Sequence, residues 1–156
     1  MGFKLYVAGN ESFGDPNYAR YIKSLCEKYD NVYYLCDKSW QSGEVSYEMK
    51  IQLMSHAKGI ILPFLRQEAF SLIALEALAC GCPVITFNYG AMPEIIEHGS
   101  VGYLCRDIFE MAEAVKKVDE IDPLDCRKHV KLYFSIEKSA EAYLKLYREI
   151  LDGGGC

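Results

Sequence analysis

The stretch from Gly59 to Phe87 constrains the fold of this chain most strongly. Two short apolar runs, 59–64 and 84–87, flank a helix-forming segment that begins near Ser71 and ends in the turn of residues 80–83. Short apolar runs on either side of a helix predict parallel strands joined by a crossover, because strands buried on both faces are apolar throughout. The same alternation along the chain predicts an α/β fold, a Rossmann-like parallel sheet with helices on both faces.

The other elements are predicted from periodicity and from helix-end signals. Further strands are expected at 3–8, 32–36 and 101–105. Further helices are expected at 17–29, 46–57, 93–97, 107–117, 122–133 and 135–151. Ser46, Asp107 and Ser135 are residue types that cap helix N-termini. The chain has 156 residues and no long linker, so we expect one domain over 1–152 with a flexible glycine tail over 153–156.

Charge and cysteine usage disfavour several classes of function. The net charge of -5 disfavours nucleic-acid or anionic-membrane binding, which depend on basic patches. No apolar run approaches the roughly 20 residues of a membrane span, and the N-terminus lacks a signal-peptide pattern, so we expect a cytoplasmic protein. The seven cysteines include no Cys-x-x-Cys pair. Small buried thiols are therefore favoured over a disulfide, and no metal site is expected.

Two carboxylates require an explanation. Glu76 lies inside the segment 71–80, which is apolar nearly all round and predicts a buried helix. Glu68 comes just before that helix. An unpartnered carboxylate in apolar surroundings destabilises a fold by about 3–5 kcal/mol. Both groups are therefore expected to accept hydrogen bonds from a partner or a ligand.

Ligands of parallel sheets bind beyond the carboxyl ends of the strands, where loops enter helix N-termini. The loops predicted to lie there are 9–16, 36–46, 64–71 and 88–93. One of them contains Glu68, and the free N–H groups of the helix that begins at Ser71 could hold a phosphate. Gly90 is interpreted as permitting a turn. Trp40 either packs locally or forms a stacking platform, and Glu94, His98 and His129 are interpreted as structural.

Four motifs in order carry a family resemblance. They are Glu68-x7-Glu76, then Ala79-Cys-Gly-Cys-Pro-Val-Ile85, then Gly90-Ala-Met-Pro-Glu94, then Gly99-Ser-Val-Gly102. Over about residues 3–150 the chain resembles the C-terminal, donor-binding half of retaining glycosyltransferases of the group 1 type. These enzymes have the GT-B fold, in which two Rossmann-like domains face each other across a cleft.

The resemblance implies a binding site for a nucleoside-diphosphate sugar. Glu68 would be the residue at the catalytic centre, where it would lie against the sugar hydroxyls. It would position the donor rather than act as a nucleophile. Glu76 would accept hydrogen bonds from the ribose diol. The backbone N–H groups of Phe70, Ser71 and Leu72 would face the sugar and the diphosphate. The family usually needs no metal and no further cofactor, since helix dipoles and basic side chains offset the phosphate charge.

The chain departs from the family pattern in several places. Ser71, Ala91 and Cys36 each stand where the family commonly has Gly. The usual first strand–helix unit, with its Gly-Arg…Lys-Gly segment that grips the diphosphate, has no counterpart in the sequence, and neither has the acceptor-binding domain. We therefore expect a half-enzyme that is inactive alone. It would pair with an N-terminal acceptor domain, either in the same chain or in a separate one. Any peripheral contact with a membrane would be made by that domain.

Two other classes of function stay open. One is a non-catalytic half-domain that binds nucleotide weakly or pairs with a separate subunit. The other is a different GT-B enzyme, such as an epimerase or a phosphorylase, although no lysine lies in a context that suggests a pyridoxal site.

Overall fold

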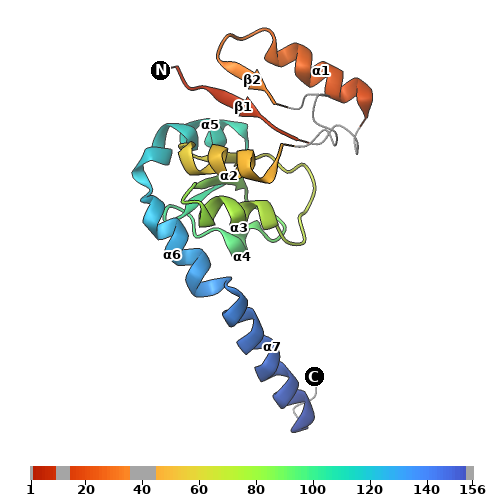
Figure 1. The fold of residues 1–156 in the computed structure, drawn as a ribbon, viewed down its shortest axis with the longest axis vertical. Helices are drawn as coiled ribbons and strands as arrows, with labels where there is room; N and C mark the ends of the chain where they lie inside the picture. The colour runs from red at the N-terminus through yellow and green to blue at the C-terminus, as the bar shows by residue number, and fades with distance from the viewer. Residues whose placement is uncertain (1, 10–14, 36–44, 154–156) are drawn as a thin grey trace. The chain divides into compact units, whose positions relative to one another are not determined.

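The computed structural model describes residues 2–9, 15–35 and 45–153 (Figure 1). These residues belong to two compact units, Met1–Ile51 and Gln52–Cys156, each with its own sheet. Trp40, Cys36 and Cys156 lie outside the described residues, so the expectations made for them stay predictions. The boundaries proposed for a single domain over 1–152 also stay a prediction.

The first unit contains a parallel pair of strands and a helix. β1 (Leu5–Val7) pairs with β2 (Val32–Tyr34), and α1 (Pro16–Cys26) connects them. Asp15 is the N-cap of α1, and its carboxylate accepts a hydrogen bond from the Asn17 N–H at 2.8 Å. Proline suits the first helical position because it has no N–H to leave unpaired.

α2 (Tyr47–His56) spans the division between the two units. Its predicted cap is confirmed, because the Ser46 hydroxyl accepts a hydrogen bond from the Met49 N–H at 3.2 Å.

The second unit contains three parallel strands in the order β3-β4-β5. These are β3 (Ile60–Leu62), β4 (Val84–Phe87) and β5 (Gly102–Cys105). The helices are α3 (Leu72–Ala79), α4 (Met92–Ile95), α5 (Ile108–Lys117), the 3₁₀ turn η2 (Val118–Glu120), α6 (Pro123–Tyr133) and α7 (Ile136–Leu151). The prediction of an α/β fold built on parallel strands is confirmed. The turn η2 was not expected, and Pro93 occupies the second position of α4 rather than the first.

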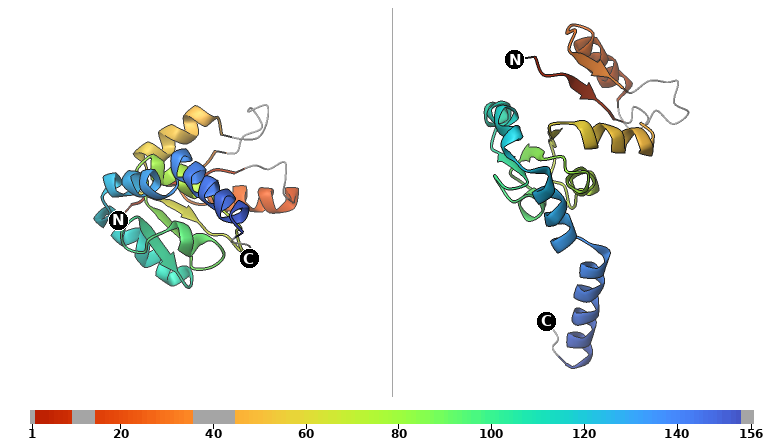
Figure 2. Two further views of the ribbon diagram at one scale, coloured as in Figure 1. Left: turned by 90° about the horizontal axis from the view of Figure 1, so that it is seen from below. Right: turned by 60° about the vertical axis from the view of Figure 1, so that its left-hand side comes forward.

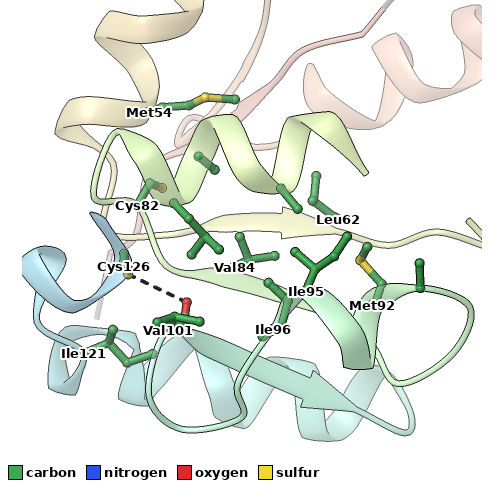
Figure 3. Packing of buried hydrophobic residues seen from close by; sticks show 14 residues of the cluster. Met54, Leu62, Cys82, Val84, Met92, Ile95, Ile96, Val101, Ile121 and Cys126 are labelled. Carbon is green, nitrogen blue, oxygen red and sulfur yellow. Dashed lines mark hydrogen bonds between the residues drawn. The ribbon is translucent and has the colours of Figure 1, made fainter. Parts of the chain in front are cut away.

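The core of the second unit forms between the sheet and the helices that cross it. Val84 of β4 lies at its centre with Leu62 of β3, and Ile95 and Ile96 approach from the segment of α4 (Figure 3). Cys126 of α6 is fully buried and donates a weak hydrogen bond to the Val101 carbonyl at 3.8 Å. No helix among the described residues is long and apolar enough to span a membrane.

The described cysteines are free thiols, as expected. Cys26, Cys82, Cys105 and Cys126 are buried, and Cys80 is half-buried. Burial raises the pKa of the Cys82 thiol to about 12 and that of Cys126 to about 11. Both thiols are therefore neutral at physiological pH, and they pack as small apolar groups.

The expectation that α3 is buried all round is wrong. Ala74, Ala77 and Leu78 are fully buried, but Leu72 is 69% exposed and Ile73 37% exposed. The reason is that the second unit covers only one face of this helix. Apolar composition alone cannot show which faces of a helix find a partner.

Thr86 joins the carboxyl ends of β3 and β4. Its side chain is fully buried, and its hydroxyl donates to the Leu62 carbonyl at 2.9 Å. We expect Thr86→Val to lower the free energy of unfolding by about 0.5–1.5 kcal/mol, since the shape is kept but the Leu62 carbonyl loses one donor and keeps that of the Phe64 N–H. Urea denaturation would measure the change. Thr86→Ser keeps the donor and removes a methyl group; a neutral Val variant beside a destabilised Ser variant would show that only packing matters here.

Candidate functional site

Two loops meet where they leave the carboxyl ends of β3 and β4. The two strands pair in parallel with Ile60 opposite Val84, so their carboxyl ends lie at the same edge of the sheet. One loop leads from β3 to α3 and contains Glu68. The other leads from β4 to α4 and contains Gly90. Parallel α/β sheets generally bind ligands at this edge. Both loops are among those expected there from the sequence.

The backbone of Glu68 is held by the neighbouring loop. The Ala91 N–H donates to the Glu68 carbonyl at 2.9 Å. Gly90 has a φ of +62°, and a Cβ added to it would lie 2.8 Å from both the N and the O of Glu68. The interpretation of Gly90 as a turn residue is confirmed, and the structure adds a contact that sequence reasoning missed. The only feature of the sequence that pointed to this contact was the glycine in the loop after the strand 84–87.

Ser71 caps α3. Its side chain is nearly fully buried, and its hydroxyl accepts a hydrogen bond from the Ala74 N–H at 3.4 Å. The flanking side chains of Phe70 and Leu72 are exposed, at 50% and 69%. Because the first-turn N–H groups of a helix have no acceptor within it, the start of α3 can donate hydrogen bonds to an anion.

Glu76 lies on the face of α3 that the core does not cover. Helical spacing places it on the same side as Leu72 and Ile73, about 6 Å further along the axis from Leu72. Its side chain is half-buried, as is that of Glu68. The expectation of carboxylates enclosed in apolar surroundings is therefore wrong for the described chain. Each side chain is partly exposed instead.

The C-terminus of α3 is held by a basic side chain. Arg127 of α6 donates from Nη2 to the Cys80 carbonyl at 2.9 Å. A cation at a helix C-terminus stabilises the helix dipole. This contact, together with the packing of α6 on α3, fixes the orientation of the helix that carries Glu76.

A surface hollow of about 740 Å³ lies elsewhere, along β5 and α5. Its polar groups pair with one another. His98 accepts a hydrogen bond at Nδ1 from the Leu104 N–H at 3.0 Å. Arg106 donates to both carboxylate oxygens of Glu110 and thereby lowers the pKa of that carboxyl. This hollow contains neither Glu68 nor Glu76, and the loop site at β3 and β4 remains the candidate.

No cluster of three or more His, Cys, Asp or Glu side chains able to hold a metal occurs in the part of the chain that the structure describes. His129 is structural, as interpreted from the sequence, since its Nε2 lies 2.9 Å from the Ile95 carbonyl.

Taken together, these observations describe an α/β protein whose candidate site lies at the carboxyl edge of a parallel sheet. Residues 2–141 match the family described as glycosyl transferases group 1, and the chain belongs to this family. Two solved structures are similar to it and have the GT-B fold. Sucrose-phosphate synthase from Thermosynechococcus elongatus has a TM-score of 0.71 and 25% identity. AviGT4, a glycosyltransferase involved in avilamycin A biosynthesis, has a TM-score of 0.68 and 23% identity.

Curated relatives agree with this assignment. The chain is 33% identical over 100 residues to N-acetyl-alpha-D-glucosaminyl L-malate synthase of Bacillus anthracis. This alignment covers 59% of the chain and 26% of that protein. It is 34% identical over 112 residues to the human alpha-1,3/1,6-mannosyltransferase ALG2, covering 67% of the chain and again 26% of the relative. The structural matches cover 97% and 96% of the chain but 39% and 44% of the solved chains. The chain thus spans between 26% and 44% of the length of these relatives.

The contact between Gly90 and Glu68 can be tested by adding one methyl group. We expect Gly90→Ala to destabilise the protein by about 1–3 kcal/mol more than Gly99→Ala, as measured by chemical denaturation. Both glycines have a positive φ, but an added Cβ meets nothing within 4 Å at Gly99. The control therefore carries the backbone strain alone. Equal losses in the two variants would show that the contact with Glu68 is not important.

Proposed function

We propose that this chain is the donor-binding half of a retaining glycosyltransferase, that it binds a nucleoside-diphosphate sugar, and that it is inactive alone. One observation carries the proposal. The loop of Gly90 and Ala91 fixes the backbone of Glu68 beside the N-terminus of α3, whose uncovered face presents Glu76.

The diphosphate would bind at the start of α3. The N–H groups of Phe70, Ser71 and Leu72 precede or begin the helix, where the helix dipole favours negative charge. The Ser71 hydroxyl accepts a hydrogen bond from the Ala74 N–H and is nearly fully buried, so in this proposal the phosphate contacts the backbone N–H groups of this turn rather than that hydroxyl. In this proposal no metal ion is needed.

The two carboxylates would bind the two ends of the donor. Glu76, one turn into α3, would accept both hydrogen bonds of a ribose diol, since a carboxylate offers two oxygens. Glu68, held through its backbone, would accept hydrogen bonds from the sugar hydroxyls. The half-buried state of both side chains supports these roles, because each remains reachable while its surroundings strengthen the hydrogen bonds.

The reaction proposed for the complete enzyme is front-face transfer of the sugar. The acceptor oxygen forms a bond to the anomeric carbon as the bond to the diphosphate breaks, and the acceptor proton passes to the leaving diphosphate. Glu68 orients the sugar and is neither nucleophile nor base. The acceptor site and the basic groups that oppose the diphosphate would come from the further half, in cis or in trans.

A non-catalytic half-domain is the second candidate. It is favoured by the lack of a Gly-Arg…Lys-Gly segment in residues 1–156, because a donor site without those basic side chains binds diphosphate weakly. Binding and turnover measurements separate the two candidates.

Removal of one charge at Glu76 tests the ribose contact. We expect Glu76→Gln to weaken binding of nucleoside diphosphates by about 1–3 kcal/mol, since one charged acceptor is lost. Isothermal titration with the diphosphates of uridine, guanosine and adenosine would measure it. Glu113→Gln, on the exposed surface of α5, is the matched control. If all three nucleotides bind the Glu76 variant and the unchanged protein equally well, the ribose role is wrong.

The isolated chain should bind donor without transferring sugar. We expect no turnover above the uncatalysed rate when residues 1–156 are incubated with nucleoside-diphosphate sugars and released nucleotide is measured, because the acceptor site is not part of the proposed half. Robust turnover would contradict the half-enzyme proposal. The absence of any nucleotide binding would instead contradict the donor-site proposal.

A further inference from the structure

α6 contacts both of the segments that border the candidate site. It lies beside α3 within the second unit, as Figures 1 and 2 show. Near the C-terminus of α6, the Nε2 of His129 lies 2.9 Å from the carbonyl oxygen of Ile95, the last residue of α4. The ring of Phe134, the C-cap of α6, lies 6.5 Å from the ring of Phe70, measured between centroids. Phe70 belongs to the loop between β3 and α3, and α4 follows the loop after β4, so this end of α6 reaches both loops.

The ring of His129 is held in one orientation. Its side chain is 11% exposed. The rings of Tyr133 and Phe134 lie 5.1 and 5.7 Å from it, between centroids, which are distances typical of packed aromatic rings. Because the Ile95 carbonyl can only accept a hydrogen bond, Nε2 must carry the proton and donate it. The other nitrogen, Nδ1, lies 3.8 Å from the Glu97 carboxylate, so both ring nitrogens face the segment that ends α4.

The position of α4 depends on contacts of this kind. α4 has only four residues, too few for a helix that is stable by itself. The last carbonyls of a helix find no donor within it, and His129 supplies a donor to that of Ile95. α4 begins directly after Ala91, whose N–H donates to the Glu68 carbonyl. A shift of α4 would therefore draw Ala91 away from Glu68.

We propose that His129 is a positioning residue for Glu68, on which it acts through α4 and the Ala91 N–H. The consequence for binding rests on the proposed function, in which the Glu68 side chain accepts hydrogen bonds from the sugar of the donor. α3, which carries Glu76, is held separately by Arg127. Loss of the His129 contact should therefore weaken binding of the sugar and leave binding of the nucleotide unchanged.

Gln and Asn at position 129 test the contact, because both carry an amide donor but differ in reach. The Gln nitrogen can occupy the position of the imidazole Nε2, whereas the shorter Asn side chain reaches only that of Nδ1. In the 156-residue chain without ligand, we expect His129→Asn to speed hydrogen exchange of the Ala91 amide by about tenfold, since its bond to Glu68 opens more easily. His129→Gln should keep the original rate. The Val84 amide, which donates to the Val101 carbonyl at 3.3 Å, is the internal control for general stability.

The affinity gained from the sugar tests the effect on the donor. Isothermal titration would compare the diphosphates of uridine, guanosine and adenosine with their glucose, mannose and N-acetylglucosamine conjugates. We expect His129→Asn to bind the conjugates about tenfold more weakly, since Glu68 is displaced from the sugar hydroxyls, while it binds the free diphosphates as before. His129→Gln should behave as the unchanged protein. A role limited to general stability would affect both kinds of ligand alike.

An Ala91 amide that keeps its exchange rate in His129→Asn, or Ala91 and Val84 amides that speed up together, would overturn the inference. So would an Nδ1–H tautomer of His129 in the unchanged protein, which nitrogen NMR detects without any variant. Faster exchange of Ala91 with unchanged affinity for the conjugates would overturn the link to the sugar. If no nucleotide binds the unchanged chain, the proposed function is wrong, and the exchange rates alone decide whether His129 holds the loop.

Discussion

The hydrogen bond from the Ala91 N–H to the Glu68 carbonyl is the contact on which the proposed site depends. It joins two loops that leave neighbouring strands, and it forms only because Gly90 has no Cβ to separate them. The two strands that lead into these loops are also joined, since the Thr86 hydroxyl of β4 donates a hydrogen bond to the Leu62 carbonyl of β3. With both loops fixed, the N-terminus of α3 begins at a defined position and Glu68 is held beside it.

α3 is suited to this place because two of its three buried residues are alanines. Ala74 and Ala77 are fully buried, and small side chains let the helix approach the strands and α6 closely. Arg127 of α6 holds the other end through the Cys80 carbonyl. The helix is thus anchored at both ends and along one face. Its remaining face, which carries Glu76, lies outside the core, and it is this face that the proposed donor site uses.

The loop site offers carboxylates and helix N–H groups, which suit a polar, phosphorylated ligand. The chain belongs to the group 1 glycosyltransferase family, and the donor-binding role proposed for this site is consistent with that membership.

Much of the local structure could be predicted from the sequence, because its causes are local. The caps at Asp107 and Ser135, the strand of Val84–Phe87 and the parallel α/β architecture depend on residues close together in the chain, and they are confirmed. The motif spacing also identified the family. The start of α4 at Met92 and the turn η2 were missed, since short helical turns have almost no periodicity to detect.

What only the tertiary structure decided is which faces and groups meet. The sequence by itself determined that the segment 71–80 is helical and apolar and that Glu76 lies within it. It could not determine that Leu72 and Glu76 share an uncovered face, or that the backbone of Glu68 rests against Gly90, 22 positions away. Local propensity depends on a residue and its near neighbours, whereas burial and loop-to-loop contact depend on which distant segments the fold brings together.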